Sequence, residues 1–140
     1  MIFRDDLFKN KSVLVTGGGT GIGKEIAAQF LKSGATVFIC GRKEAKLKEA
    51  IEELSLLGPC FEKTTDIRDT AQILDLANFI KEKTGRLDIL INNAGLSMRA
   101  LFNDLDLAVI RNLMDVNFWG TVYCTKYALP EILKTKGSII

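Results

Sequence analysis

The residues with the clearest chemical pattern form the stretch Thr16-Gly17-Gly18-Gly19-Thr20-Gly21-Ile22-Gly23. An apolar run at 12–15 precedes it and predicts a buried strand, and apolar residues at helical spacing follow it up to about residue 31. A glycine-rich turn between a strand and a helix lets backbone N–H groups approach a diphosphate, and the helix N-terminus faces that anion with its positive dipole end. The pattern predicts a dinucleotide site that includes Gly17, Gly19, Thr20, Gly21, Ile22 and Gly23.

Two other interpretations of this stretch stay open. From Gly18 to Lys24 the sequence fits G-x-x-x-x-G-K, which is a phosphate-binding P-loop without its last residue. A P-loop has Ser or Thr at the next position, because that hydroxyl ligates magnesium, and Glu25 stands there instead. The second alternative is a purely structural turn.

Overall composition limits the class of protein and its partners. With 140 residues, of which 47% are hydrophobic and 26% charged, the chain has the size of one globular domain with a real core. A net charge of +2 is too small to indicate a nucleic-acid partner. The N-terminal stretch 1–11 is charged and lacks the apolar core of a signal peptide. No apolar run approaches the ~18 residues needed to span a membrane, so we expect no membrane span, and a cytoplasmic location is the default expectation.

Metal chemistry is not indicated. The chain has no histidine, which excludes His-ligated zinc and histidine-dependent catalytic triads. Its three cysteines, Cys40, Cys60 and Cys124, lie far apart and form no C-x-x-C pair, so we interpret them as small buried apolar residues.

Strand-like and helix-like segments alternate along the whole chain. Strands are predicted at 12–15, 36–40, 60–65 and 88–92, with a fifth beginning at 138. Helices are predicted at about 22–32, at 43–57, from Asp69 or Thr70 to 84, and from about 107 onward. Pro130 is expected to kink or end the last of these helices. Alternation of this kind predicts an α/β fold, a Rossmann-type doubly wound parallel sheet with helices on both faces. Residues 1–140 would form a single dinucleotide-binding domain whose sheet stops at the fifth strand.

The end of the second predicted strand bears on the choice of cofactor. A dinucleotide site normally contacts the adenosine ribose about 20 residues past the glycine loop, where a carboxylate would repel a 2′-phosphate. Gly41 stands there, followed by Arg42 and Lys43, and a guanidinium pairs well with phosphate. These residues favour NADP over NAD, an inference that depends mostly on Arg42. The alternative is that Arg42 is a solvated residue at a helix start.

Two motifs together resemble the short-chain dehydrogenase/reductase family. The family's T-G-x-x-x-G-I-G pattern matches residues 16–23, and Asn92-Asn93-Ala94-Gly95 matches its second motif at the end of the fourth strand. The resemblance covers residues 11–140 but only the N-terminal, cofactor-binding half of a family member. It implies that Asn93, Ala94 and Gly95 line the cofactor and that Asp66 and Ile67 meet its adenine, although an Asp at position 66 could equally cap a helix.

The same resemblance implies an activity and an active-site residue. Family members transfer hydride between the nicotinamide of NADP(H) or NAD(H) and a carbonyl or secondary alcohol. Asn117, within the matching stretch 114–120, would belong to the active site, where its backbone carbonyl holds a water of the proton relay. The segment 96–102 and the neighbourhood of 117–119 resemble, more weakly, the hydroxysteroid dehydrogenase branch, which suggests a small-molecule substrate of lipid-like character. The family implies a homo-oligomer.

One departure from the family limits these expectations. The family's catalytic Ser and Tyr-x-x-x-Lys do not occur, since Tyr123 is followed four residues later by Tyr127, and Tyr127 by Glu131. Both tyrosines are interpreted as packing residues. We therefore expect the chain to be inactive alone. Two alternatives are a non-catalytic dinucleotide-binding module and a Rossmann-type methyltransferase, although Gly41 argues against the latter.

Overall fold

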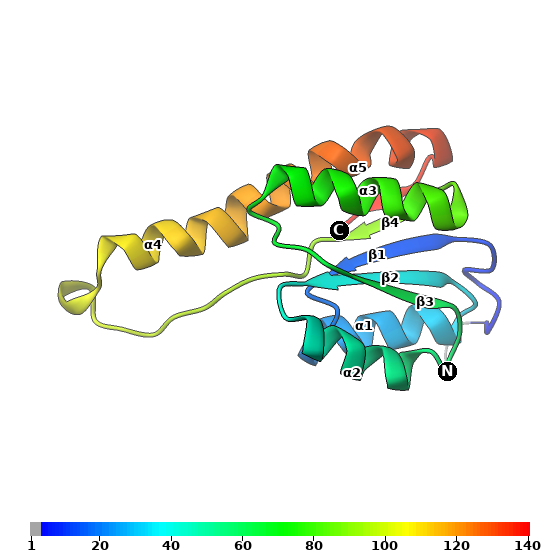
Figure 1. The fold of residues 1–140 in the computed structure, drawn as a ribbon, viewed down its shortest axis with the longest axis horizontal. Helices are drawn as coiled ribbons and strands as arrows, with labels where there is room; N and C mark the ends of the chain where they lie inside the picture. Colours follow the sequence, from blue (N-terminus) through cyan, green and yellow to red (C-terminus); the bar gives the residue numbers. More distant parts are fainter. Residues whose placement is uncertain (1–3) are drawn as a thin grey trace.

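Five parallel strands form the central sheet of the computed structural model, which describes residues 4–140 (Figure 1). Residues 1–3 of the charged N-terminal stretch lie outside the described residues. The strands are β1 Ser12–Thr16, β2 Thr36–Gly41, β3 Cys60–Thr64, β4 Ile89–Ile91 and β5 Ser138–Ile139. Their order in the sheet is β3-β2-β1-β4-β5, so the direction of strand addition reverses between β1 and β4.

Helices cover both faces of this sheet. Helices α1 (Gly21–Lys32) and α2 (Glu44–Leu54) lie on one face, and α3 (Thr70–Thr84) and α5 (Thr121–Thr135) lie on the other (Figure 1). The predicted doubly wound α/β fold is confirmed. In such a sheet, ligands bind outside the carboxyl ends of the strands, at the point where the strand order reverses.

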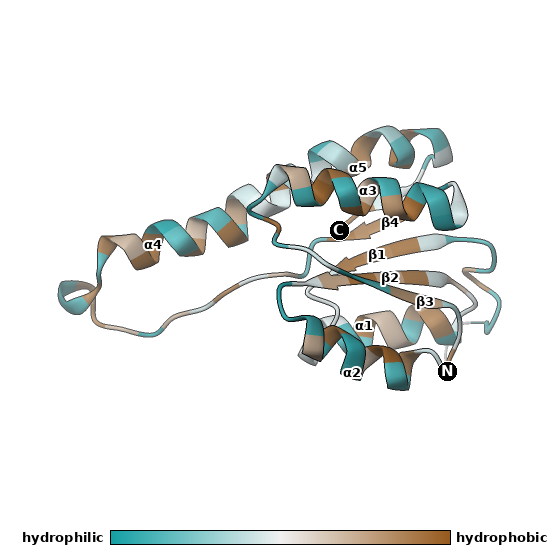
Figure 2. Ribbon diagram, viewed as in Figure 1, coloured by the Kyte–Doolittle hydropathy of each residue, from teal (hydrophilic) through white to brown (hydrophobic). Residues whose placement is uncertain are grey.

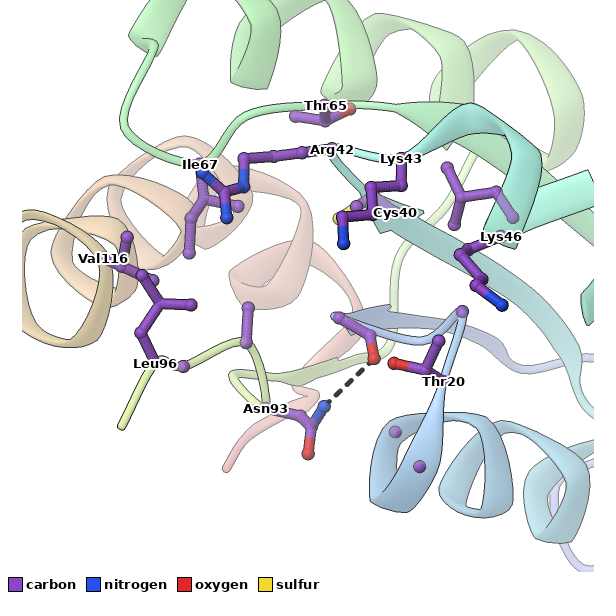
Figure 3. Close-up of a pocket in the computed structure, with 18 of the residues that line it drawn as sticks. Thr20, Cys40, Arg42, Lys43, Lys46, Thr65, Ile67, Asn93, Leu96 and Val116 are labelled. Carbon is purple, nitrogen blue, oxygen red and sulfur yellow. Dashed lines mark hydrogen bonds between the residues drawn. The ribbon is translucent and has the colours of Figure 1, made fainter. Parts of the chain in front are cut away.

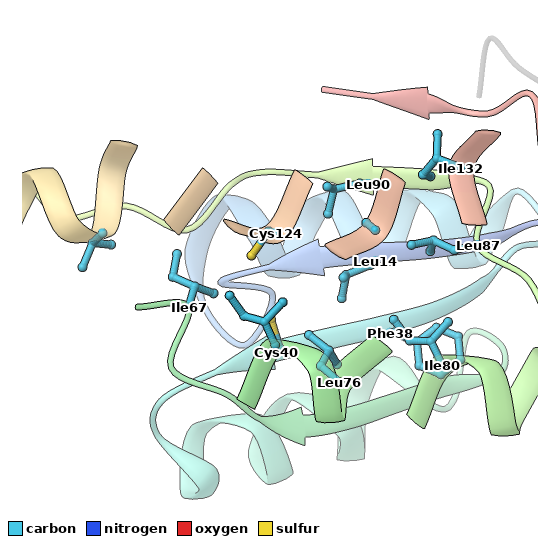
Figure 4. Close-up of a cluster of buried hydrophobic side chains, with 13 residues drawn as sticks. Leu14, Phe38, Cys40, Ile67, Leu76, Ile80, Leu87, Leu90, Cys124 and Ile132 are labelled. Carbon is cyan, nitrogen blue, oxygen red and sulfur yellow. The ribbon is translucent and has the colours of Figure 1, made fainter. Parts of the chain in front are cut away.

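A separate apolar core lies on each side of the sheet. One packs β1 and β2 against α1 and α2, and the other packs the opposite sheet face against α3 and α5. Figure 2 shows the apolar strands between the mixed surfaces of the helices, and Figure 4 shows Leu14, Phe38, Leu76 and Ile132 of the second core. Residues 37–40 are fully buried, as a strand covered on both faces requires.

Helix α3 has both ends fixed by its own sequence. Asp69 is the N-cap, and its carboxylate accepts hydrogen bonds from the N–H groups of Ala71 and Gln72. At the other end Gly85 adopts the left-handed conformation, with φ of 69°. The predicted start and stop of this helix are both confirmed.

The predicted long helix forms three consecutive segments and does not end at Pro130. Helix α4 (Leu107–Met114) continues into a π-helical turn, η2 (Asp115–Gly120), and then into α5, which runs to Thr135. Pro130 lies on the exposed side of α5, so the carbonyl that loses its N–H partner can be solvated. Packing of Cys124, Ala128 and Ile132 against the core carries the helix through this position.

The segment between β4 and η2 extends away from the sheet. Residues 92–106, which include the short 3₁₀ turn η1 (Phe102–Asp104), lead to α4, and both project beyond the other elements (Figure 1). Leu101, Phe102 and Leu107 are exposed there. Within residues 4–140, no helix combines the length and apolar character needed to cross a membrane.

Candidate functional site

A cavity of about 450 Å³ lies at the carboxyl ends of β1 to β4. The glycine-rich turn after β1 forms one wall, the ends of β2 and β3 form a second, and residues 93–96 after β4 form a third (Figure 3). All fourteen residues predicted to contact a cofactor line it: Gly17, Gly19, Thr20, Gly21, Ile22, Gly23, Gly41, Arg42, Lys43, Asp66, Ile67, Asn93, Ala94 and Gly95. These fourteen residues come from four separate parts of the sequence and meet at one cavity.

Glycines bring the backbone of the turn close to its neighbours. Gly17 has φ of 65°, and a Cβ there would lie 3.0 Å from the Cα of Ala94. A Cβ at Gly23 would collide with the Gly17 carbonyl and the Asn93 amide. Gly21, with φ of 54°, faces open space, since nothing lies within 4 Å of its would-be Cβ. The turn is tightly packed behind and open toward the cavity, which leaves its backbone accessible to a ligand.

Thr16 and Asn93 join the ends of β1 and β4 beneath this turn. The Thr16 hydroxyl accepts hydrogen bonds from the N–H groups of Asn93, at 3.1 Å, and Ala94, at 3.0 Å, and donates to the Ile91 carbonyl. The Asn93 side-chain amide donates to the carbonyls of Thr16, at 3.0 Å, and Gly17, at 3.3 Å, and Figure 3 draws one of these two bonds as a dashed line. Through these bonds the Asn93 amide side chain ties the neighbouring strands β1 and β4 at this motif.

Basic side chains border the cavity at the end of β2. Arg42 and Lys43 follow Gly41, and Figure 3 shows the Lys43 and Lys46 amines turned toward the glycine-rich turn. Lys46 was not among the residues predicted from the sequence, although its place in the first turn of α2, three residues after Lys43, is a usable signal. The Lys46 amine lies 3.3 Å from the exposed Glu49 carboxylate, and such an exposed pair is weak and easily exchanged for another anion.

Asp66 lines the cavity beside its own cationic partner. The Arg68 guanidinium donates to both carboxylate oxygens of Asp66, with Nη2 2.6 Å from Oδ2 and Nε 3.0 Å from Oδ1. These hydrogen bonds hold the pKa of the Asp66 carboxyl below its usual value, against the opposing effect of partial burial. The open alternative for this residue was helix capping, but Asp69 is the N-cap of α3 and Asp66 pairs with Arg68.

Asn117 lies just behind the cavity wall in the π-helical turn. Its side-chain oxygen accepts from the Leu96 N–H and its amide donates to the Leu96 carbonyl, both at 2.7 Å. A Cβ at Gly95 would lie 3.3 Å from the same side-chain oxygen. The side chain therefore positions residues 95 and 96, which line the cavity, while the active-site role of Asn117 stays a prediction. π-Helical turns are frequent at functional sites.

The cavity lining also includes residues that were not predicted from the sequence. Leu96 and Val116 give an apolar wall near Asn117, and Thr65 and Leu47 close the side formed by β3 and α2. Thr65 and Leu96 are direct neighbours of the predicted Asp66 and Gly95, whereas Leu47 and Val116 reach the cavity from helical segments whose spacing gave no signal for it. Among residues 4–140, no cluster of three or more potential metal-ligating side chains occurs.

The structure contradicts the P-loop alternative. The Lys24 amine, which a P-loop would direct at phosphates, pairs with the Glu53 carboxylate of α2 at 2.7 Å. Lys24 is not among the residues that line the cavity. The turn therefore presents backbone, with no lysine of its own, to the cavity.

Comparison with known proteins agrees with this arrangement. The family model described as short chain dehydrogenase matches residues 11–140, nearly the whole chain. The chain belongs to this family. The glycine-rich motif at 16–23 and the motif at 92–95 carried the resemblance to this family. In this chain the two motifs pack together through Thr16 and Asn93.

Curated relatives are similar over most of this chain. The chain is 38% identical to dehydrogenase/reductase SDR family member 7B of Xenopus tropicalis, over 91% of this chain and 44% of the relative. It is 35% identical to 11-beta-hydroxysteroid dehydrogenase-like 4A of Arabidopsis thaliana, over 93% of this chain and 44% of that protein. The chain thus spans less than half the length of these curated short-chain dehydrogenases.

Solved structures show the same fold. A short-chain type dehydrogenase/reductase from Mycobacterium ulcerans superposes with a TM-score of 0.89 at 33% identity, covering 94% of this chain and 50% of that one. The Pseudomonas aeruginosa RhlG/NADP active-site complex gives a TM-score of 0.88 at 32% identity, covering 96% of this chain and 52% of that one. The chain corresponds to the N-terminal, cofactor-binding portion of a short-chain dehydrogenase.

Proposed function

We propose that this chain is the NADP(H)-binding part of an oxidoreductase that transfers hydride between nicotinamide and a carbonyl or secondary alcohol. The supporting observation is the cavity itself, which joins an open glycine-rich turn to a border of three basic side chains. Residues 1–140 would act as one dinucleotide-binding domain within the enzyme, and a homo-oligomer would be its working form.

The cavity fits a dinucleotide in shape and in polarity. The N-terminus of α1 and the turn before it offer backbone N–H groups to a diphosphate, and the open space at Gly21 leaves room for that group. Gly41 places no carboxylate at the end of β2, where one would repel a 2′-phosphate. Arg42, Lys43 and Lys46 supply positive charge at the same end, so a 2′-phosphorylated cofactor fits better than NAD(H).

The opposite end of the cavity is suited to position a nicotinamide and a substrate. When bound, the cofactor supplies the hydride, and the protein orients it. Residues 94–96 form a backbone wall that Asn117 holds through two hydrogen bonds of 2.7 Å. Leu96 and Val116 make this end apolar, which would exclude water and favour a lipid-like substrate. The hydroxysteroid dehydrogenase names among the relatives support the same substrate class.

Calorimetric titration with NADP⁺ and NAD⁺ tests the proposal. Wild-type protein should bind NADP⁺ roughly ten- to a hundredfold more tightly, because a charge-assisted contact to the 2′-phosphate is made with only one of the two cofactors. Arg42→Ala should remove most of this preference and leave the NAD⁺ affinity unchanged. Arg111→Ala removes an exposed arginine on α4 and is the matched control.

Equal affinities of the wild-type protein for the two cofactors would contradict the proposed NADP preference. If the wild-type protein binds neither cofactor, the proposed dinucleotide site as a whole is contradicted.

A further inference from the structure

Arg68 connects the cavity to a helix that does not line it. On one side its guanidinium and backbone N–H donate to the Asp66 carboxylate, with four contacts between 2.6 and 3.2 Å. On the other side its Nη1 donates to the side-chain oxygen of Asn112 at 2.8 Å. Asn112 lies on α4, 44 residues further along the chain. One planar group therefore spans from a cavity carboxylate to a remote helix.

A second contact fixes the same loop against the same helix. Ile67 is buried, and its side chain occupies the space that the missing side chain of Gly120 leaves in the π-helical turn η2. Asp66, Ile67 and Arg68 are consecutive, so the loop after β3 is held at adjacent positions by one apolar and one polar contact. Figure 3 shows Ile67 and Val116 on this side of the cavity.

This arrangement restricts what the Asp66 carboxylate can do. A guanidinium that pairs with both carboxylate oxygens fixes their plane, and Asn112 in turn fixes the plane of the guanidinium. Arg42 and Asp115 are the other charged groups close enough to affect this pair electrostatically. An ionised carboxylate only accepts hydrogen bonds. The cavity therefore presents an oriented acceptor at this position and no donor from Asp66.

We propose that Arg68, held by Asn112, is a positioning residue that aims the Asp66 carboxylate at the purine of the bound dinucleotide, so that the cavity selects a 6-amino purine over a 6-oxo purine. The inference depends on the dinucleotide function proposed above. The 6-amino group of adenine donates a hydrogen bond to a carboxylate, whereas the 6-oxo group of hypoxanthine is an acceptor and is repelled. Selectivity of this kind needs an orientation that a freely rotating Asp66 would not keep.

The test compares calorimetric affinities for NADP⁺ and for its hypoxanthine analogue, in which a 6-oxo group replaces the 6-amino group and N1 gains a hydrogen, so that the donor moves from the 6-position to N1. Wild-type protein should prefer NADP⁺ by roughly tenfold or more, the range expected for a hydrogen bond to a charged group. Arg68→Ala should reduce the preference to about threefold or less, and Arg68→Lys, which keeps the charge but not the planar pairing, should act in the same direction. Asn112→Ala should give an intermediate ratio, and Arg111→Ala should leave it unchanged.

The ratio of the two affinities separates positioning from a general structural effect. If Arg68→Ala weakens both dinucleotides equally and keeps the wild-type ratio, Arg68 is a structural residue and the proposal is wrong. If wild-type protein does not distinguish the two purines, Asp66 does not contact this group and the proposal is also wrong, while the dinucleotide site stands. If wild-type protein binds neither dinucleotide, both proposals fail together.

Discussion

Strands β1 and β4 are joined in different ways at their two ends. We call the carboxyl ends of the parallel strands the carboxyl edge of the sheet and their amino ends the amino edge. At the carboxyl edge the connection consists of neutral hydrogen bonds between Thr16, Asn93 and the backbone. At the amino edge it is charged, since Asp88 accepts from the Ser12 N–H at 2.9 Å and from the Arg86 guanidinium, and lies 3.6 Å from the Lys11 amine. The same pair of strands therefore has a neutral connection on one edge and an ionic one on the other.

The contrast separates the residues that leave room for a ligand from those that close the structure. Thr16 and Asn93 are short and neutral, and the cavity of about 450 Å³ remains open above them. Asp88 is only 3% exposed, and Gly137 approaches its carbonyl so closely that a Cβ would overlap it. Long charged side chains and close backbone packing fill the amino edge. We infer that the carboxyl edge serves binding and the amino edge serves stability.

The largest effect is expected for Gly21→Val at the carboxyl edge. Dinucleotide binding should fall by about a hundredfold or more, because the branched side chain would enter the space left for the diphosphate. Strain from the positive φ should also cost roughly 1–2 kcal/mol of unfolding free energy. Calorimetry with NADP⁺ and chemical denaturation measure the two effects separately.

Gly85→Val is the matched control for this substitution. Gly85 also has a positive φ, 69°, and nothing lies within 4 Å of its would-be Cβ, but it ends α3 at the other edge of the sheet. It should lose similar stability and keep wild-type affinity. Undiminished NADP⁺ binding by folded Gly21→Val would mean that the turn is purely structural.

A smaller effect, on stability alone, is expected for Asp88→Asn. Burial acts to raise the pKa of the Asp88 carboxyl, but hydrogen bonds from Arg86 and the Ser12 N–H outweigh it and hold the pKa below its usual value. The ionised form therefore stabilises the fold above the unfolded-state pKa, and this contribution is lost as pH falls through the lower folded-state pKa. The variant should lose about 1–3 kcal/mol of unfolding free energy near neutral pH.

Chemical denaturation between pH 7 and pH 3 checks this prediction. The difference in unfolding free energy between the wild-type protein and Asp88→Asn should shrink as the pH falls. Asp75→Asn, an exposed aspartate on α3, is the control and should change little at any pH. A difference that stays constant down to pH 3 would show that the charge of Asp88 is not what stabilises the amino edge.

The smallest effect is expected for Lys24→Ala. Because the Lys24 amine pairs with Glu53 on the outside of α1 and α2, its loss should cost about 0–1 kcal/mol of stability and leave dinucleotide affinity unchanged. Calorimetry with NADP⁺ measures the affinity. A large loss of binding in a folded variant would revive the P-loop interpretation.

Local patterns in the sequence predicted the fold and most of the cavity lining. Alternating strand and helix periodicities, the glycine-rich turn and the helix predicted from Asp69 or Thr70 to 84 each depend on residues close together in the chain. Packing between distant parts of the fold was harder to predict from the sequence. Pro130 stays within α5 because the core holds the helix on both sides of it.

Long-range polar contacts were not predictable from spacing. The contact between Arg68 and Asn112 joins residues 44 apart, and the pairing of Asn117 with Leu96 joins residues 21 apart. These contacts form because the loop after β3, with Arg68, and the segment after β4, with Leu96, both pack against the long helix that carries Asn112 and Asn117. Asn117 was singled out through a family resemblance, and its hydrogen bonds to Leu96 became visible only in three dimensions.

The most direct test of the proposed site is a titration of the ¹⁵N-labelled protein with NADP⁺, followed by NMR amide shifts. At 15.5 kDa the chain is small enough for residue-level assignment. Saturable shift changes should concentrate at the carboxyl edge, in residues 17–23, 41–43, 66–67 and 93–96, and the amides of Ser12 and Asp88 at the amino edge should stay unchanged. Saturable changes confined to other surfaces, with the glycine-rich turn unaffected, would contradict the assignment of the carboxyl-edge cavity as the dinucleotide site.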